Sequence, residues 1–162
     1  MGNASRDAIE VVSKPENKAL VSAALKLLSR RDFSRTEFIK KLGAGEFDKA
    51  DVEAAADWCH AQGFLNESRF AESTSRRLGA KYGVQRVAHT LRQKGVAEEQ
   101  VSAMISTLKD SEQDRASALW TRKFGKIAES GSEKSKQIRY LQSRGFSFAI
   151  IKLVIARAVD DS

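Results

Sequence analysis

The side chains best suited to binding chemistry are basic residues in stretches that contain no acidic residue. Between Glu72 and Glu98, and again between Glu133 and Asp160, the chain has lysines and arginines but no carboxylate. A shorter stretch of the same kind follows Asp114. Solvated helix faces ordinarily mix both signs of charge. Stretches of one sign therefore indicate a surface that binds a polyanion or an acidic protein.

Two tyrosines lie among these cations. Lys136, Tyr140 and Arg144 are spaced at i, i+4 and i+8, which places them on one stripe of a helix. Such a stripe can bind phosphates and stack a base or a partner side chain, but Tyr140 can equally cover the edge of the core. For Lys81 and Tyr82, the glycine that follows favours a turn. The candidate partner- or DNA-binding residues are Arg76, Arg77, Lys81, Tyr82, Arg86, Arg92, Lys94, Arg122, Lys123, Lys126, Lys136, Arg139, Tyr140, Arg144, Lys152 and Arg157.

No pattern typical of an enzyme or a metal site accompanies these residues. The G-x-x-x-x-G-K-[ST] phosphate loop and the G-x-S-x-G nucleophile motif are absent. His60 and His89 have no second ligand at i+3 or i+4. The single cysteine, Cys59, excludes an internal disulfide and is predicted to be a buried thiol. We expect neither catalysis nor a cofactor.

The composition predicts a folded chain, and the net charge predicts attraction to negatively charged partners. Of the 162 residues, 41% are hydrophobic and 30% charged, which is enough apolar material for a core. Residues 1–62 carry equal numbers of basic and acidic groups, whereas residues 63–110 have an excess of three basic groups and residues 111–162 an excess of four. No apolar stretch approaches the roughly 20 residues that cross a bilayer, and the N-terminus lacks a signal-peptide pattern. A cytoplasmic location without membrane contact is expected.

The elements that position these side chains recur three times along the chain. Leu42, Leu91 and Leu141 stand 49 and 50 residues apart, and each is followed by an apolar residue five and ten positions later. Upstream, Leu20, Phe70 and Trp120 are each separated by 50 residues. The identity between the repeats is weak, but the apolar positions are kept. This pattern indicates tandem repeats of one structural unit.

Within a repeat the apolar spacing is helical, as at Val84, Val87, Ala88 and Leu91. Gly63, Gly83, Gly95 and Gly145 are placed as helix ends or turns. Ser34 and Glu37 form a predicted capping box. The expected helices cover residues 17–30, 34–43, 48–62, 66–80, 83–94, 97–109, 111–127, 133–144 and 147–159.

The fold class that follows is all-α, with three tandem three-helix repeats. The predicted divisions are a flexible N-terminal tail at 1–15 and repeats at 16–62, 63–110 and 111–162. Because a unit of this size buries little surface alone, neighbouring units must share interfaces, and stacked units give an elongated, curved body.

Two aromatic residues and the last helix carry further packing predictions. Trp120 occupies a repeated core position. Trp58 is either a packing residue between units or a partly exposed contact, and packing is favoured. The segment 147–159 is apolar around more than one face. Either a neighbouring unit covers it, which we expect, or it is a surface for RecA or for self-association.

The stretch GFLNESRFA, from Gly63 to Ala71, resembles the signature of the RecX family. Further matches are ALKLLSRRDFSRTEFIKKL (24–42), KYGVQRVAHTLRQKGV (81–96) and RYLQSRGFSFAII (139–151), in family order and spacing. Glu67-Ser68 departs from the family pattern, which more often has Asp and a charged residue there. The motif residues are Gly63, Phe64, Leu65, Asn66, Arg69, Phe70, Ala71, Arg144, Gly145 and Phe146.

The resemblance implies a bacterial, non-enzymatic regulator of RecA, monomeric and cytoplasmic, that acts in recombination, DNA repair and the SOS response. Family members lie in the groove of the RecA–single-stranded DNA filament and inhibit its recombinase, ATPase and coprotease activities. The implied partners are the RecA filament, single-stranded DNA and, weakly, duplex DNA. Two alternatives remain open: a helix-turn-helix-type protein that binds DNA without RecA, and an adaptor for another acidic protein.

Overall fold

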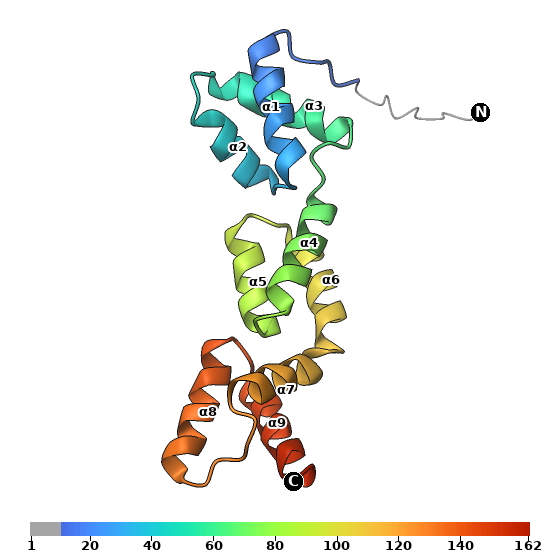
Figure 1. The fold of residues 1–162 in the computed structure, drawn as a ribbon. Coiled ribbons are helices and arrows are strands. Elements are labelled where there is room, and N and C mark those ends of the chain that lie inside the picture. Colours follow the sequence, from blue (N-terminus) through green and yellow to red (C-terminus); the bar gives the residue numbers. More distant parts are fainter. Residues whose placement is uncertain (1–10) are drawn as a thin grey trace, which may run out of the picture. The chain divides into compact units, whose positions relative to one another are not determined.

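The computed structural model describes residues 11–162, and within this range the chain is helical and contains no strand (Figure 1). The predicted N-terminal tail lies partly outside the described residues. The helices are α1 (Lys18–Arg30), α2 (Arg35–Gly43), α3 (Lys49–Ala61), α4 (Glu67–Gly79), α5 (Val84–Gln93), α6 (Glu98–Lys109), α7 (Glu112–Lys123), α8 (Gly131–Ser143) and α9 (Phe148–Asp160). The prediction of an all-α fold is confirmed for the described part of the chain.

Side-chain N-caps stabilise the starts of several helices, and glycines in the left-handed conformation follow the ends of some of them. The Ser34 hydroxyl accepts a hydrogen bond from the Glu37 amide at 3.1 Å, which confirms this half of the predicted capping box. The structure differs from the prediction at the α7–α8 connection. Gly125 has a φ of 69°, a left-handed conformation that ends α7 at Lys123 rather than at residue 127. Ser130 then caps α8 by accepting from the Glu133 amide, so this helix begins earlier than expected.

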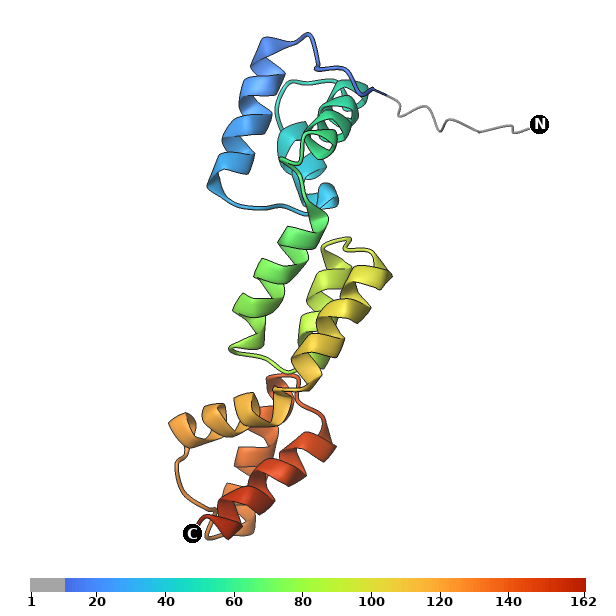
Figure 2. The ribbon, with the colours of Figure 1, turned by 90° about the vertical axis from the view of Figure 1, so that its right-hand side faces the viewer.

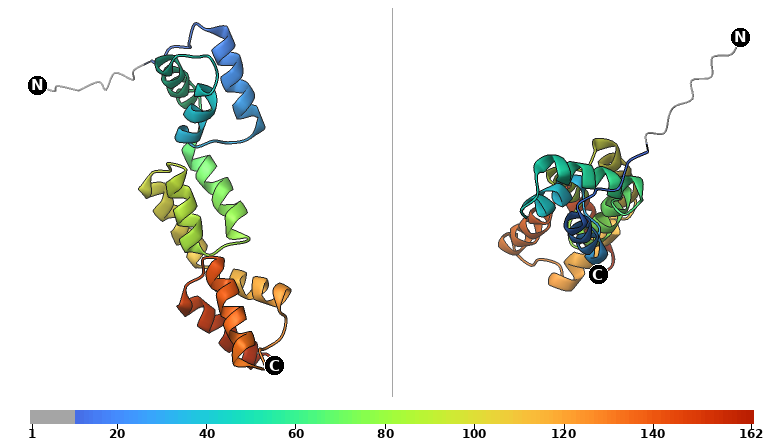
Figure 3. Two further views of the ribbon diagram at one scale, coloured as in Figure 1. Left: turned by 90° about the vertical axis from the view of Figure 1, so that its left-hand side faces the viewer. Right: turned by 90° about the horizontal axis from the view of Figure 1, so that it is seen from above.

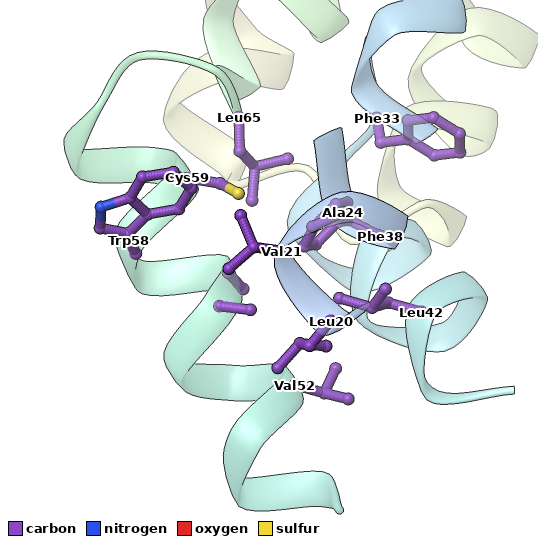
Figure 4. Close-up of a cluster of buried hydrophobic side chains, with 12 residues drawn as sticks. Leu20, Val21, Ala24, Phe33, Phe38, Leu42, Val52, Trp58, Cys59 and Leu65 are labelled. Atoms are coloured by element: carbon purple, nitrogen blue, oxygen red, sulfur yellow. The ribbon is translucent and has the colours of Figure 1, made fainter. Parts of the chain in front are cut away.

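The chain divides into two compact units, and the first contains α1, α2 and α3. Its core is built around buried apolar side chains from all three helices, including Leu20, Phe38 and Val52 (Figure 4). Cys59 is fully buried among them, and desolvation raises the pKa of its thiol to about 11. Trp58 is 9% exposed, and its ring contacts Phe64 edge-on, with 5.9 Å between ring centroids. The prediction of a buried thiol at Cys59 is confirmed, and Trp58 is a packing residue of the first unit's own core.

The second unit, Glu67–Ser162, contains two three-helix bundles, α4–α6 and α7–α9 (Figure 2). One apolar cluster fills each bundle, around Leu91 in the first and Leu141 in the second. Trp120 belongs to the latter cluster, and its indole N–H donates to the Gln137 side-chain oxygen at 3.0 Å. The core role predicted for Trp120 is confirmed. These two bundles carry all of the candidate binding residues.

The prediction that α9 is covered by a neighbouring unit is wrong for part of its surface. Ile151 and Val154 are buried against the bundle, but Phe148 is 57% exposed and Leu153 49% exposed. One stripe of α9 suffices to fill the core of this bundle, because side chains of α7 and α8 already fill the other sides of that core. Phe148, Leu153 and Val159 therefore face solvent, whereas Ile150 and Ile155 pack partly against the core.

Candidate functional site

Two turns meet where the bundles of the second unit join. The turn between α4 and α5 contacts the turn between α8 and α9 (Figure 1), and Figure 3 shows the same region from other sides. The Gly83 amide donates to the Arg144 carbonyl at 2.8 Å, and the Arg86 guanidinium donates to the Ser143 carbonyl at 3.0 Å. These bonds join segments about 60 residues apart in the sequence.

Glycines allow this close approach. A Cβ on Gly83 would lie 2.3 Å from the Gly145 carbonyl oxygen, which is closer than nonbonded atoms can come. Gly145 has a φ of 86°, and a Cβ there would lie 2.5 Å from that of Arg86. Gly83 was predicted to form a turn. The structure adds that it must be small because another backbone lies against it.

A set of alternating cations and rings, here called the basic–aromatic cluster, surrounds this junction. It consists of Tyr82, Arg86, Lys123, Tyr140 and Arg144. The Arg86 guanidinium carbon lies 4.0 Å from the centroid of the Tyr82 ring. The Arg144 guanidinium carbon lies between two rings, 5.5 Å from Tyr82 and 5.3 Å from Tyr140. The Lys123 ammonium is 5.8 Å from the Tyr140 ring. These distances fit cation–π contacts.

The two tyrosines serve both the core and the cations. Both rings are half-buried and pack against the apolar clusters of their bundles. Tyr140 also meets Phe124 edge-on at 5.4 Å between centroids. The interpretation that Tyr140 covers the edge of the core is confirmed, whereas the binding role of its stripe stays a prediction. Because the protein's own cations lie against these rings, the arrangement favours anion binding by guanidinium edges over base stacking.

The cations of the cluster carry uncompensated charge. Within residues 11–162, no carboxylate forms an ion pair with Arg86, Lys123 or Arg144. Arg86 and Lys123 are exposed and Arg144 is half-buried, so their charges can attract negative groups at short range. What distinguishes the cluster from the other exposed candidate cations is that its cations lie against tyrosine rings.

Two other candidate arginines are paired within the molecule. The Arg92 guanidinium makes two hydrogen bonds to the Glu98 carboxylate, at 2.6 and 2.8 Å. These bonds raise the pKa of Arg92 and lower that of Glu98. Arg157 donates to Asp114 at 2.9 Å. A stretch of sequence without acids can thus lie beside acids from elsewhere in the fold.

The remaining candidates lie outside the cluster. Arg76 and Arg77 are exposed in the last turn of α4, and Lys94 is the residue that follows α5. The Lys152 ammonium lies 5.6 Å from the exposed Phe148 ring. The other exposed candidates are Lys81 beside Tyr82, Arg122 on α7, Lys126 in the α7–α8 loop, and Lys136 and Arg139 on α8.

The family-motif residues have mainly structural positions. Gly63 has a φ of 79° and follows α3, and the amides of Phe64 and Leu65 donate to the Cys59 carbonyl. Phe70 is buried in the second unit. The buried members are Leu65, Phe70, Ala71 and Phe146. The motif therefore ends one helix and begins the next.

Two charged residues of α7 contribute to the junction and were not singled out from the sequence. Glu112 is 5% exposed and accepts a hydrogen bond from the Val84 amide at 3.2 Å. Arg115 donates to the Tyr82 carbonyl at 2.9 Å. Burial lowers the pKa of Arg115, and the nearby charge of Glu112 opposes this shift. The available signal was that the residue before α5, Gly83, is a glycine, which has no side chain to cap the helix.

Two further features were sought in the part of the chain that the structure describes, a metal site and a membrane-spanning helix. No group of histidine, cysteine and carboxylate side chains there is arranged to hold a metal ion. None of the helices in residues 11–162 has the length and apolar character needed to cross a membrane.

These features define a helical repeat protein made of three-helix bundles, with a cation-rich surface where two of them join. The family models for the second and third three-helix domains of RecX match residues 66–105 and 110–155. The chain belongs to the RecX family, a family of regulatory proteins rather than of known enzymes. The resemblance seen in the sequence is thereby confirmed.

Relatives and solved structures agree with this assignment. The regulatory protein RecX of Leptothrix cholodnii is 36% identical over 140 residues, which cover 86% of this chain and 89% of the relative. The regulatory protein RecX of Ralstonia pickettii is also 36% identical, over 86% of this chain and 88% of the relative. The crystal structure of RecX from Lactobacillus salivarius has a TM-score of 0.74 at 19% identity, covering 87% of this chain and 95% of that one. This structural likeness supports the repeat fold.

Proposed function

We propose that this protein is a cytoplasmic regulator that binds the RecA–single-stranded DNA filament and inhibits its recombinase, ATPase and coprotease activities. Membership of a family of regulatory proteins supports this function. The structural observation that carries it is the basic–aromatic cluster, whose three cations lack carboxylate partners in the described part of the chain.

Inhibition in this proposal works by occupancy, without chemistry of the protein's own. The tandem repeats would lie in the groove of the filament, and the cations of the second and third repeats would contact accessible DNA phosphates or acidic RecA surface. Arg86 is held both by the Tyr82 ring and by the Ser143 carbonyl, so little side-chain freedom is lost on binding. The occupied groove would then exclude incoming duplex and disturb the subunit interfaces where ATP is hydrolysed.

The test is the DNA-dependent ATPase of RecA filaments with increasing amounts of the protein. The wild-type protein should lower the rate, and the double variant Arg86→Glu/Arg144→Glu should lose most of this effect. Lys26→Glu/Arg30→Glu changes charge equally at two exposed positions of α1 and should still inhibit. An unchanged ATPase rate at saturating wild-type protein would overturn the proposal.

A second candidate function is direct DNA binding without RecA, because the same unpaired cations suit bare DNA phosphates. Salt titration of binding to a bare oligonucleotide separates the two. High affinity with a steep salt dependence in the absence of RecA supports the direct binder. Weak binding that becomes strong only when RecA coats the DNA supports the regulator.

A further inference from the structure

The turn that carries Tyr82 is capped by residues of another helix. Gly83 precedes α5 and makes no side-chain cap, so the first amides of this helix need an outside acceptor. Glu112 of α7 supplies it by accepting from the Val84 amide at 3.2 Å. A carboxylate at this position also interacts favourably with the positive end of the helix dipole.

Arg115, one turn later on α7, caps the opposite kind of helix end. One of its terminal nitrogens donates to the Tyr82 carbonyl at 2.9 Å and to the Gly79 carbonyl at the end of α4. The other donates to the Leu108 carbonyl near the end of α6 at 3.0 Å. The planar guanidinium thus joins the ends of two helices and the turn between α4 and α5, a geometry that the ammonium of lysine does not reproduce.

Neither residue belongs to the basic–aromatic cluster. Arg115 binds the carbonyl of the residue before Gly83, and Glu112 binds the amide of the residue after it. The Gly83 amide itself donates to the Arg144 carbonyl. The Tyr82 ring, which is attached to this backbone, lies against the guanidinium groups of Arg86 and Arg144. Contacts therefore connect α7 to the turn that carries Tyr82, and connect the Tyr82 ring to the guanidinium groups of Arg86 and Arg144.

We propose that Glu112 and Arg115 are positioning residues for the basic–aromatic cluster, which they hold in its binding geometry by fixing the turn that carries Tyr82. The biological role of this positioning rests on the proposed function, because it assumes that the cluster contacts the filament. The positioning itself is a property of the free protein and can be tested there.

The first experiment records the side-chain Nε–H resonances of Arg86 and Arg144 in the free protein by NMR. A guanidinium above a ring is shifted upfield by the ring current, so wild-type Arg86 should show this shift. Arg115→Met should abolish it, and Glu112→Gln, which keeps the shape and an acceptor oxygen, should reduce it. Lys109→Met removes an exposed cation from the last turn of α6 and should leave it unchanged.

A purely stabilising role gives a different result. Arg115→Met would then lower the melting temperature but keep the Arg86 shift in the folded protein, and this outcome overturns the proposal. If Arg115→Met does not fold, Arg115→Lys provides the same comparison, since it keeps the charge but loses the planar fork. Circular dichroism identifies the conditions in which each variant is folded.

A double-mutant cycle links the positioning to function. With Tyr82 present, Arg115→Met should weaken binding to RecA-coated oligodeoxythymidylate about tenfold, within the range of couplings between contacting residues. In the Tyr82→Ala background it should have little further effect, because the ring through which it acts is gone. Additive losses contradict the inference. If wild-type protein does not bind the filament, the proposed function fails, while the NMR result still decides the positioning.

Discussion

At the scale of single residues, the cluster depends on ring faces rather than on tyrosine hydroxyls. We expect Tyr82→Phe to inhibit the RecA ATPase nearly as well as wild type, because the ring that supports Arg86 is kept. Tyr82→Ala should raise the half-inhibiting concentration about tenfold, which corresponds to the loss of partly desolvated cation–π contacts. Titration of the ATPase with the three proteins measures this. Equal inhibition by the alanine variant would contradict it.

Cys59 provides a prediction about the first unit that is independent of binding. Burial raises its thiol pKa to about 11, so the folded protein keeps the thiol protonated when a free thiol would begin to ionise near pH 9. The unfolded state then releases a proton that the folded state retains, and the free energy of unfolding should decrease as pH rises from about 9 to 11. Urea unfolding of wild type and Cys59→Ala across this range checks it. A loss of equal slope in both proteins would assign the effect to other groups.

The residue scale also shows where sequence reasoning succeeds and where it stops. Trp120 and Cys59 were predicted correctly because each lies on an apolar stripe with helical spacing, which is a local property. The ion pair between Arg157 and Asp114 joins positions 43 residues apart, and the sequence contains no sign of it. Glu112 was missed for the same reason: its partner, the Val84 amide, belongs to a different bundle.

At the scale of elements, the contact between two turns has its own energetic test. Gly83→Ala places a methyl group where the Gly145 backbone lies, so the turns must separate. We expect a loss of about 1–3 kcal/mol in the free energy of unfolding, typical of overpacked sites. Gly131→Ala is the matched control, since its Cβ meets nothing within 4 Å at the start of α8, and it should be neutral or stabilising. Denaturant unfolding of both variants decides; equal stability would refute the close contact.

Helix positions follow from the sequence more readily than helix ends. Apolar periodicity located the helices of the described region to within a few residues. The end of α7 was predicted too late because Phe124 and Ile127 continue its apolar pattern, while the chain in fact leaves the helix at Gly125. The exposed Phe148 and Leu153 show the converse limit: an apolar pattern around a helix does not reveal how many of its sides are covered.

At the scale of the whole molecule, the boundary between the two units also separates a neutral part of the chain from a basic part. The ten basic and ten acidic residues of positions 1–66 cancel, so the net charge of +7 lies wholly in Glu67–Ser162. The sequence predicted this division, because charge can be counted along it. The sequence could not predict that α4–α6 and α7–α9 form one unit. Their association depends on the contact of Gly83 with the α8–α9 turn, which is far away in the sequence.

This division predicts which part of the chain gives filament binding its salt dependence. A fragment of residues 67–162 keeps both of its apolar cores and the whole basic–aromatic cluster, so it should fold and bind RecA-coated oligodeoxythymidylate. Its affinity should fall with added salt about as steeply as that of the full chain, because the slope reflects the number of anionic contacts. A fragment of residues 1–66 is the control. Fluorescence anisotropy at several salt concentrations measures both, after circular dichroism confirms folding. Steep, salt-dependent binding by residues 1–66 would show that excess charge is not what the filament recognises.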